Sequence, residues 1–288
     1  MAKIAVVTDS NSGITVADGR KLGVYVMPMP VQIDGTTFYE GENLTQDDFY
    51  RHMAAGAELS TSQPAPGDIT GLWDRVLEEH DGLVYIPMSA GLSSSCATAQ
   101  MLAQGYEGRV QVVDNRRISI VQRYAVLDAL ALAHAGHSAS DIRTTLEEQG
   151  DDFCIYITVD TLKYLRKGGR VNGVEAVAGA MLNIKPVMEI ARDKLTPVAK
   201  VRGMKAARKL MLDRVRADVE GRLKPLRDSG HLAIKMACSQ VSPELWEDWR
   251  AEIHAAFPDE PVIEGDPLTL SVAVHTGPGA LGVGAVRI

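Results

Sequence analysis

The first half of the chain alternates short apolar runs with longer stretches of helical periodicity, and this alternation restricts the fold more than any other feature of the sequence. Apolar runs bounded by turn residues indicate buried strands at Lys3–Val7 and Leu83–Met88, and a third strand is expected at Val110–Val113. The stretches with helical periodicity are Gln46–Ala55, Ile69–His80, Ser93–Gln104, Ile120–Ala135 and Ser140–Gln149. Strands that alternate with helices favour βαβ units, so the pattern predicts a Rossmann-like α/β domain with a parallel sheet.

The second half has a different pattern. Strands are expected at Phe153–Val159, Ile184–Ile190 and Leu195–Val201, and the last two predict a hairpin. The other expected elements are helices at Thr161–Lys167, Gly173–Leu182, Met204–Lys224 and Pro243–Phe257 and strands at His231–Ser239, Val262–Glu264, Ser271–His275 and Gly282–Arg287. A hairpin followed by a late cluster of strands predicts a mixed sheet. We therefore expect two α/β domains, an N-terminal one at residues 1–150 and a C-terminal one with a mixed sheet at residues 151–288.

Composition excludes several classes of protein. The formal net charge of -7 argues against general binding of nucleic acid. No apolar stretch is long enough to span a bilayer, and the run Ile4–Val7 is too short for the core of a signal peptide. Cys96, Cys154 and Cys238 form no CxxC pair, which is typical of reduced thiols. We expect a cytoplasmic protein without an integral membrane segment.

Two segments of the first half are rich in hydroxyl side chains. Ser93, Ser94 and Ser95 fall at the cap and first turn of an expected helix, where free N–H groups and the helix dipole favour an anion. The simpler interpretation is that one of these serines caps the helix. The other segment is Ser60–Pro66, in which two prolines stiffen the chain around Thr61 and Ser62. It is equally typical of a proline-rich turn before a helix.

The ends of the expected parallel strands carry further polar residues. Thr8–Asp9–Ser10 and Asp114–Asn115 follow two of these strands, at the edge where ligands bind in open α/β sheets. Either acidic residue can instead serve as an ordinary turn or cap residue, which is the commoner role. The sequence alone leaves both interpretations open.

Motifs for catalysis, metals and nucleotides are not apparent. The segment Gly91–Ser95 lacks the G-x-S-x-G spacing of a nucleophile elbow, and neither GxGxxG nor GxxxxGK[ST] occurs. His134 and His137 are three residues apart but have no third ligand nearby in the sequence. We therefore expect no catalytic residue, no metal site and no cofactor.

A basic segment lies just after the expected domain boundary. Arg166, Lys167 and Arg170 flank a double glycine, and Lys185 and Arg202 follow later in the chain. A solvated basic face is the usual explanation of such charges. Arginine also suits bidentate recognition of carboxylate or phosphate, so a phosphate or partner site is an alternative.

An ordered series of motifs resembles one known family. The series consists of Thr8–Asp9–Ser10, Thr61–Pro64, Gly91–Ser93, Val113–Asp114, Leu162–Arg170, Leu182–Pro186, Arg202–Gly203 and His275–Gly279. Each motif is weak alone, but together and in this order they resemble the DegV family of bacterial fatty-acid-binding proteins over nearly the whole length of the chain.

The resemblance implies a long-chain fatty acid bound between two α/β domains. It implies that Thr61, Ser62 and Ser93 contact the fatty acid carboxylate and that His275 belongs to the same polar network. It also implies that the protein is not itself an enzyme but presents the carboxylate to a separate ATP-dependent fatty acid kinase, whose acyl-phosphate product feeds phospholipid synthesis. By the same resemblance, Arg170 and Arg202 contact the phosphate or the kinase.

The chain departs from the family pattern at two places. Ala65 stands where the family usually has Ser after TSQP, and Ser94-Ser95-Cys96 replaces the usual Gly-Thr-Tyr after GLS. One hydroxyl is lost and others are gained, which predicts rearranged headgroup contacts. Two alternative functions remain at this stage, an enzyme acting on a small acidic or phosphorylated metabolite and a lipid sensor that does not transfer its ligand. The sequence does not specify acyl length, unsaturation, oligomeric state or the kinase.

Overall fold

The computed structural model describes residues 2–169, 183–191 and 194–288. The chain forms two compact units. The first comprises Met1–Asp151 and Thr269–Ser271, and the second comprises Asp152–Leu268 and Val272–Ile288. The sequence-based boundary near residue 150 did not anticipate that a short segment from the C-terminal part of the chain packs with the first unit.

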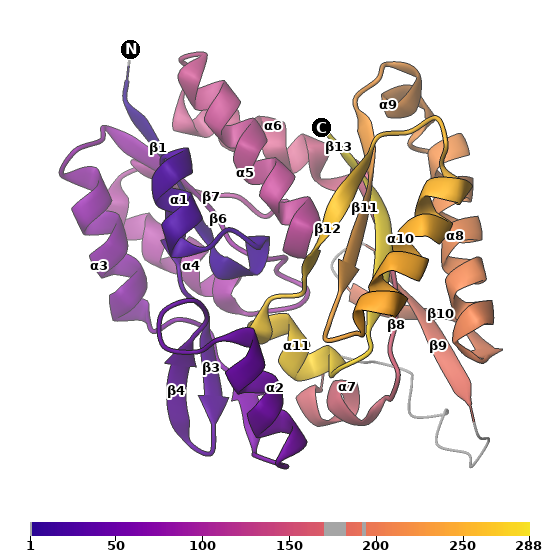
Figure 1. Ribbon diagram of the computed structural model, residues 1–288. Helices are drawn as coiled ribbons and strands as arrows, with labels where there is room; N and C mark the ends of the chain where they lie inside the picture. The colour runs from indigo at the N-terminus through magenta and orange to yellow at the C-terminus, as the bar shows by residue number, and fades with distance from the viewer. Residues whose placement is uncertain (1, 170–182, 192–193) are drawn as a thin grey trace. The chain divides into compact units, whose positions relative to one another are not determined.

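The first unit is built on a parallel sheet, as the sequence predicts (Figure 1). Its strands are β1 (Ile4–Asp9), β2 (Val24–Met27), β6 (Gly82–Ile86) and β7 (Val110–Val112), in the order β2–β1–β6–β7. Each neighbouring pair runs parallel. The carboxyl ends of these strands therefore lie at one edge of the sheet, where the loops that follow them are grouped.

Helices cover both faces of this sheet. Buried side chains of α5 (Ser119–His134) and α6 (Ala139–Glu148) pack with Val6 and Val84 on one face. Those of α3 (Pro66–Leu77) and α4 (Ser95–Ala103) pack with Val7 and Tyr85 on the other. Alternate residues of a strand point to opposite faces, so strands covered on both sides need the continuous apolar runs seen in the sequence.

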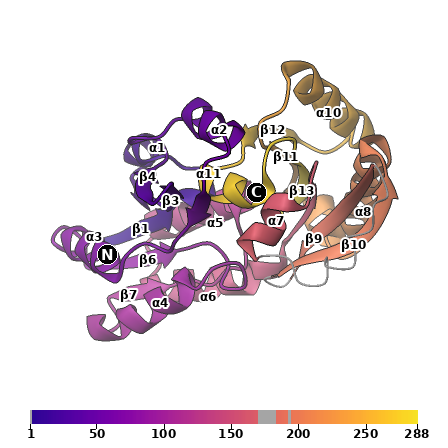
Figure 2. The same ribbon diagram turned by 90° about the horizontal axis from the view of Figure 1, so that it is seen from below.

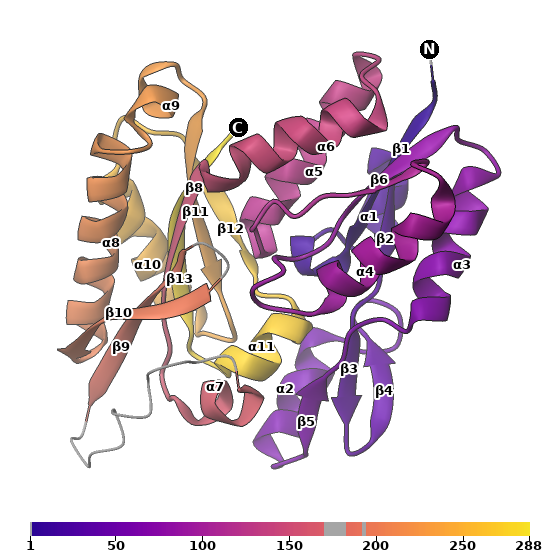
Figure 3. The ribbon, with the colours of Figure 1, turned by 180° about the vertical axis from the view of Figure 1, so that it is seen from behind.

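A small antiparallel sheet was not predicted. It consists of β3 (Pro30–Ile33), β4 (Thr36–Tyr39) and β5 (Leu59–Thr61), in the order β4–β3–β5, and lies beside α2 (Gln46–Ala54) in Figure 3. The helix α1 (Val16–Leu22), capped by Thr15, was also missed. An extended segment was expected at Val24–Ile33, which includes β3, but β4 and β5 were not. Strands of three or four residues carry little periodicity, which explains why β4 and β5 escaped detection.

The second unit contains the expected mixed sheet. The strands are β8 (Phe153–Thr158), β9 (Ile184–Ala191), β10 (Lys194–Arg202), β11 (Leu232–Cys238), β12 (Val262–Pro267) and β13 (Leu281–Arg287). Their order is β10–β9–β8–β13–β11–β12. The strands β9 and β10 form the predicted antiparallel hairpin, and β11 and β12 pair in parallel.

Helices α7 and α8 lie on opposite faces of this mixed sheet (Figure 2). The long helix α8 (Met204–Glu220) and α10 (Pro243–Ala256) bury Met211 and Trp249 against one face, and α9 (Lys224–Asp228) follows α8. On the other face α7 (Lys163–Gly168) buries Leu165. The expected helix Gly173–Leu182 lies outside the described residues.

One expected element is wrong. Ser271–His275 was expected to be a strand but forms part of helix α11 (Leu270–Thr276). The segment alternates small and β-branched residues, which suggests a strand. However, the buried apolar residues are Leu270, Ala273 and Val274, at the i, i+3, i+4 spacing of a helix.

Candidate functional site

Buried polar side chains occupy the loops after β1, β6 and β7. Among them, Asp9, Ser12, Ser89 and Asn115 are fully buried, and Asn11 is 1% exposed. Burying a polar group costs free energy unless it forms hydrogen bonds. The hydrogen bonds of these loops therefore define how the edge of the first unit is built.

Asp9 at the end of β1 organises this edge. Its Oδ2 accepts a hydrogen bond from the backbone N–H of Met88 (2.8 Å). Its Oδ1 accepts from the N–H of Asn11 and from Nε2 of Gln122, both at 3.0 Å. Burial raises the pKa of Asp9 from 3.8 to about 6, even though these three donors act in the opposite direction. Asp9 thus joins three separate segments of the chain and not only its own turn.

The loop from Met88 to Ser95 is held at successive residues. After the bond from Met88 to Asp9, the N–H of Ser89 donates to the carbonyl of Arg117 (2.9 Å). The N–H of Ala90 then donates to Oδ1 of Asp114 (3.3 Å). Both acidic residues at the strand ends therefore position this loop, which carries Ser93.

Ser93 lies at the end of this loop and is half-buried. Its Oγ accepts from the N–H of Ser95 (3.1 Å), so the hydroxyl caps the start of α4. Within the described part of the chain, no acceptor lies within hydrogen-bond distance of its proton. A hydroxyl that accepts from the backbone and keeps its proton available can donate to a carboxylate. The capping and ligand-binding interpretations of Ser93 are therefore compatible.

The second hydroxyl segment lies next to α4. Thr61 ends β5 and is half-buried, and Ser62 follows it and is exposed. Oε1 of Gln63 accepts hydrogen bonds from Oγ of Ser94 and Oγ1 of Thr98, both at 3.1 Å. This contact fixes the segment that carries Thr61 and Ser62 to the helix whose start carries Ser93. Three of the four expected carboxylate-binding residues therefore belong to neighbouring segments of the first unit.

The start of α11 also belongs to the first unit. Oγ of Ser271 donates to Oδ1 of Asn11 (2.5 Å), and the N–H of Leu270 donates to Oε2 of Glu40 (2.7 Å). Burial raises the pKa of the Glu40 carboxyl. The sequence analysis missed these roles of Glu40, Asn11 and Gln63. Each depends on a partner more than thirty residues away, which is Leu270, Ser271 and Ser94 respectively.

His275 lies near the end of α11, in the second unit, and is half-buried. Its ring packs against the backbone of Gly168 at the end of α7, where no space remains for a Cβ atom. A Cβ on Gly277 would likewise overlap the ring of Tyr164. The Gly-Pro turn after His275 and the end of α7 therefore fit closely together, and this fit holds the imidazole in place.

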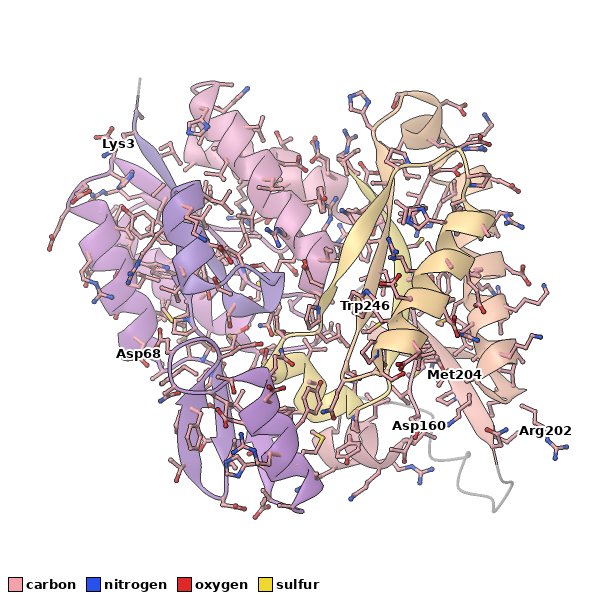
Figure 4. All side chains as sticks on the ribbon, in the orientation of Figure 1. Lys3, Asp68, Asp160, Arg202, Met204 and Trp246 are labelled. Atoms are coloured by element: carbon pink, nitrogen blue, oxygen red, sulfur yellow. The ribbon has the colours of Figure 1, made fainter. Side chains whose placement is uncertain are left out.

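The basic residues expected at a phosphate or partner site are in different situations. Arg202 is exposed at the end of β10, as Figure 4 shows, and forms no ion pair within the described residues. Nζ of Lys185 pairs with Oδ1 of Asp160 (2.5 Å) and donates to its carbonyl (2.8 Å). Lys185 therefore has a structural partner within the second unit, whereas Arg202 has its charge available. Arg170 lies outside the described residues.

The described residues form neither a metal-binding cluster nor a membrane-spanning helix. No group of three or more His, Cys, Asp or Glu side chains in residues 2–169, 183–191 and 194–288 is arranged to hold a metal ion. None of the helices in the same ranges is long and apolar enough to cross a membrane. Cys96, Cys154 and Cys238 are buried and are not joined in disulfides.

Comparison with known proteins places the chain in one family. A family model described as "Uncharacterised protein, DegV family" matches residues 3–287. A DegV domain-containing protein of Deinococcus radiodurans is 33% identical over 283 residues, which cover 97% of each chain. This resemblance extends over both units.

Solved structures of the same family have the same fold. A DegV family protein from Thermus thermophilus, described by its fatty acid binding, is 32% identical, with a TM-score of 0.87 and full coverage of both chains. A fatty acid binding DegV family protein from Streptococcus agalactiae is 26% identical, with a TM-score of 0.86 and full coverage of both chains. With its parallel and mixed sheets and its motifs in order along the whole sequence, the chain belongs to the DegV family.

Proposed function

We propose that this protein binds a long-chain fatty acid and that Thr61, Ser62 and Ser93 receive its carboxylate, with His275 in the same polar network. The observation that carries the proposal is the contact between Gln63 and the start of α4, because it joins the two hydroxyl segments. The fatty acid binding of the Thermus thermophilus relative supports the choice of ligand.

The physical chemistry of the ligand is consistent with this site. Burying one methylene contributes about 0.8 kcal/mol, so a chain of roughly sixteen carbons contributes on the order of 10 kcal/mol before the costs of ordering. A carboxylate removed from water needs hydrogen-bond donors. Hydroxyl groups supply such donors without adding a charge to the site.

In this proposal the protein carries its ligand and does not catalyse a reaction. A separate ATP-dependent fatty acid kinase in the cytoplasm phosphorylates the carboxylate, and the acyl-phosphate enters phospholipid synthesis. Arg202, exposed and free of ion pairs within the described residues, and Arg170 contact the phosphate or the kinase. The position of the ligand between the two domains, which the resemblance implies, is part of the same proposal.

Native mass spectrometry of the freshly purified protein tests the first step. We expect an added mass that matches a fatty acid and disappears after delipidation. A protein that neither retains nor takes up a fatty acid, but converts a small acidic metabolite, would show that the enzyme alternative is correct. If fatty acid binds but no candidate kinase phosphorylates it in the presence of ATP, the protein is a lipid sensor and the presentation step is wrong.

A further inference from the structure

Gln63 is oriented by two hydroxyl groups of α4. Oγ of Ser94 and Oγ1 of Thr98 both donate to its Oε1 at 3.1 Å. Ser94 is the N-cap of α4 but makes no capping hydrogen bond with its side chain, since its hydroxyl is directed to Gln63. Thr98 lies one turn further along the helix, and its N–H donates to the carbonyl of Ser94 (3.0 Å). Both hydroxyl groups meet the same atom of the amide, so this end of the side chain is held against α4.

The other end of the amide remains available. Nε2 of Gln63 has two N–H donors, and no acceptor for them lies within hydrogen-bond distance in residues 2–169, 183–191 and 194–288. The side chain is half-buried, and its neighbours in the chain are Ser62 and the buried Pro64. Ser93, the residue before Ser94, likewise has no acceptor for its hydroxyl proton within hydrogen-bond distance in the described residues.

We propose that Gln63 is a further ligand-binding residue, whose amide donates to the anionic headgroup received by Thr61, Ser62 and Ser93. This inference rests on the proposed function of the site and adds a donor to it. Ser94 and Thr98 are positioning residues in this arrangement, because they act on the headgroup through Gln63. Ser94 is one of the hydroxyls gained where the chain departs from the family pattern.

The variant Gln63→Glu separates the two roles of the side chain. A glutamate has the same length and still accepts hydrogen bonds from Ser94 and Thr98, so the contact with α4 is kept. It replaces the free N–H donors with an oxygen that carries negative charge. A carboxylate ligand is then repelled by a like charge where the wild type offers a donor. An uncharged ligand is not repelled.

The experiment compares a long-chain fatty acid with the alcohol of the same chain length, using fluorescence displacement on the delipidated protein at neutral pH. We expect Gln63→Glu to weaken binding of the acid at least about tenfold and binding of the alcohol less than about twofold. The control Gln100→Glu introduces the same charge at an exposed position of α4 and should leave both affinities unchanged. Equal affinity of wild type and Gln63→Glu for the acid would overturn the inference.

A double variant, made in the wild type and in Gln63→Glu, tests the positioning role. Ser94→Ala combined with Thr98→Val keeps the amide but removes both of its supports, and should weaken binding of the acid several-fold. In the Gln63→Glu background the same two changes should leave the affinity for the acid no weaker than in Gln63→Glu alone, since the donor they orient is absent. Additive losses would contradict the positioning role. If the wild type binds neither ligand, the proposed function fails. This outcome differs from the one that overturns the inference alone, in which the wild type and Gln63→Glu bind the acid with equal affinity.

Discussion

Gly168 and His275 are in direct contact in the second unit. A Cβ atom on Gly168 would overlap Nδ1 of the histidine and lie 2.9 Å from its Cε1. The end of α7 thus forms one wall of the space that the imidazole occupies. Gly168 belongs to the same motif, Leu162–Arg170, as the basic residues. This motif therefore also determines the position of the His275 ring.

Gly168→Ala is expected to displace the His275 ring. The added methyl group should lower the free energy of unfolding by about 1–3 kcal/mol and weaken fatty acid retention. His275→Ala should weaken retention with little loss of stability. The double variant should be more stable than Gly168→Ala alone, because the ring that obstructs the methyl group is gone.

Chemical denaturation and native mass spectrometry measure these effects. Gly67→Ala is the control, since it adds the same methyl group to a helix where nothing lies within 4 Å. That change should leave retention unaltered and stabilise the protein by up to about 1 kcal/mol. A Gly168→Ala protein with wild-type stability and retention would show that the contact with His275 is absent in solution.

Ser93→Ala is expected to weaken fatty acid binding about tenfold, because it removes a hydroxyl whose proton is available to the carboxylate. It also removes the acceptor for the N–H of Ser95, so a loss of about 1 kcal/mol in stability should accompany it. Titration calorimetry on delipidated protein measures the affinity. The control Ser140→Ala, at an exposed serine of α6, should change neither property. Full fatty acid occupancy in Ser93→Ala would count against the headgroup assignment.

Asp9→Asn is expected to remove a pH dependence from the stability of the protein. Since burial raises the pKa of Asp9 from 3.8 to about 6, the folded protein keeps a proton that the unfolded chain releases at lower pH. The stabilisation from this proton is fully present below about pH 4 and is lost as the pH rises through about 6. In total, the contribution of Asp9 to the free energy of unfolding falls by about 3 kcal/mol as the pH rises through this range.

Denaturation of both proteins at several pH values between about 4 and 7 tests this prediction. The free energy of unfolding of the wild type should fall relative to that of Asp9→Asn as the pH rises, because asparagine does not titrate. Asp47→Asn, at an exposed position of α2, is the control for loss of one carboxyl group. A constant difference between wild type and Asp9→Asn across this range would mean that Asp9 does not titrate there.

The sequence was sufficient for the parts of the fold that depend on local periodicity. The parallel strands β1 and β6 contain continuous apolar runs because helices cover both of their faces. The antiparallel sheet was missed because β3 pairs with β5, nearly thirty residues away and only three residues long. The segment Ser271–His275 was predicted as a strand because it alternates small and β-branched residues. Its buried residues in α11 nevertheless have helical spacing.

For the candidate site, the sequence supplied residues but few of their contacts. Two hydroxyl-rich segments marked Ser93 and Thr61 as candidates, and their contact with a ligand stays a prediction. The roles of Asp9 and Gln63 depend on partners far away in sequence, Met88 and Gln122 for the first and Ser94 for the second. Asp9 does serve its own turn by accepting from Asn11, as the simpler interpretation held, but that bond is one of three. Local patterns cannot reveal contacts of this kind.

If the protein presents its ligand to a fatty acid kinase as proposed, Arg202→Ala is expected to leave fatty acid binding unchanged and to slow acyl-phosphate formation several-fold. Arg202 is exposed at the end of β10, outside the hydroxyl segments, and its charge is not neutralised by an ion pair within the described residues. An exposed charge of this kind acts mainly on the rate of encounter with a partner of opposite charge or on a bound phosphate.

Single-turnover phosphorylation of the loaded protein at two ionic strengths tests this role. The defect of Arg202→Ala should shrink at high salt, because salt screens the attraction that the wild type gains from the guanidinium. Lys209→Ala is the matched control, since Lys209 is a solvent-exposed cation of the same unit whose charge is already paired with Asp213 (2.6 Å). If both variants slow the reaction equally, the effect reflects the overall charge of the protein, and Arg202 has no specific role in the contact with the kinase. An Arg202→Ala protein that is phosphorylated at the wild-type rate would exclude the role altogether.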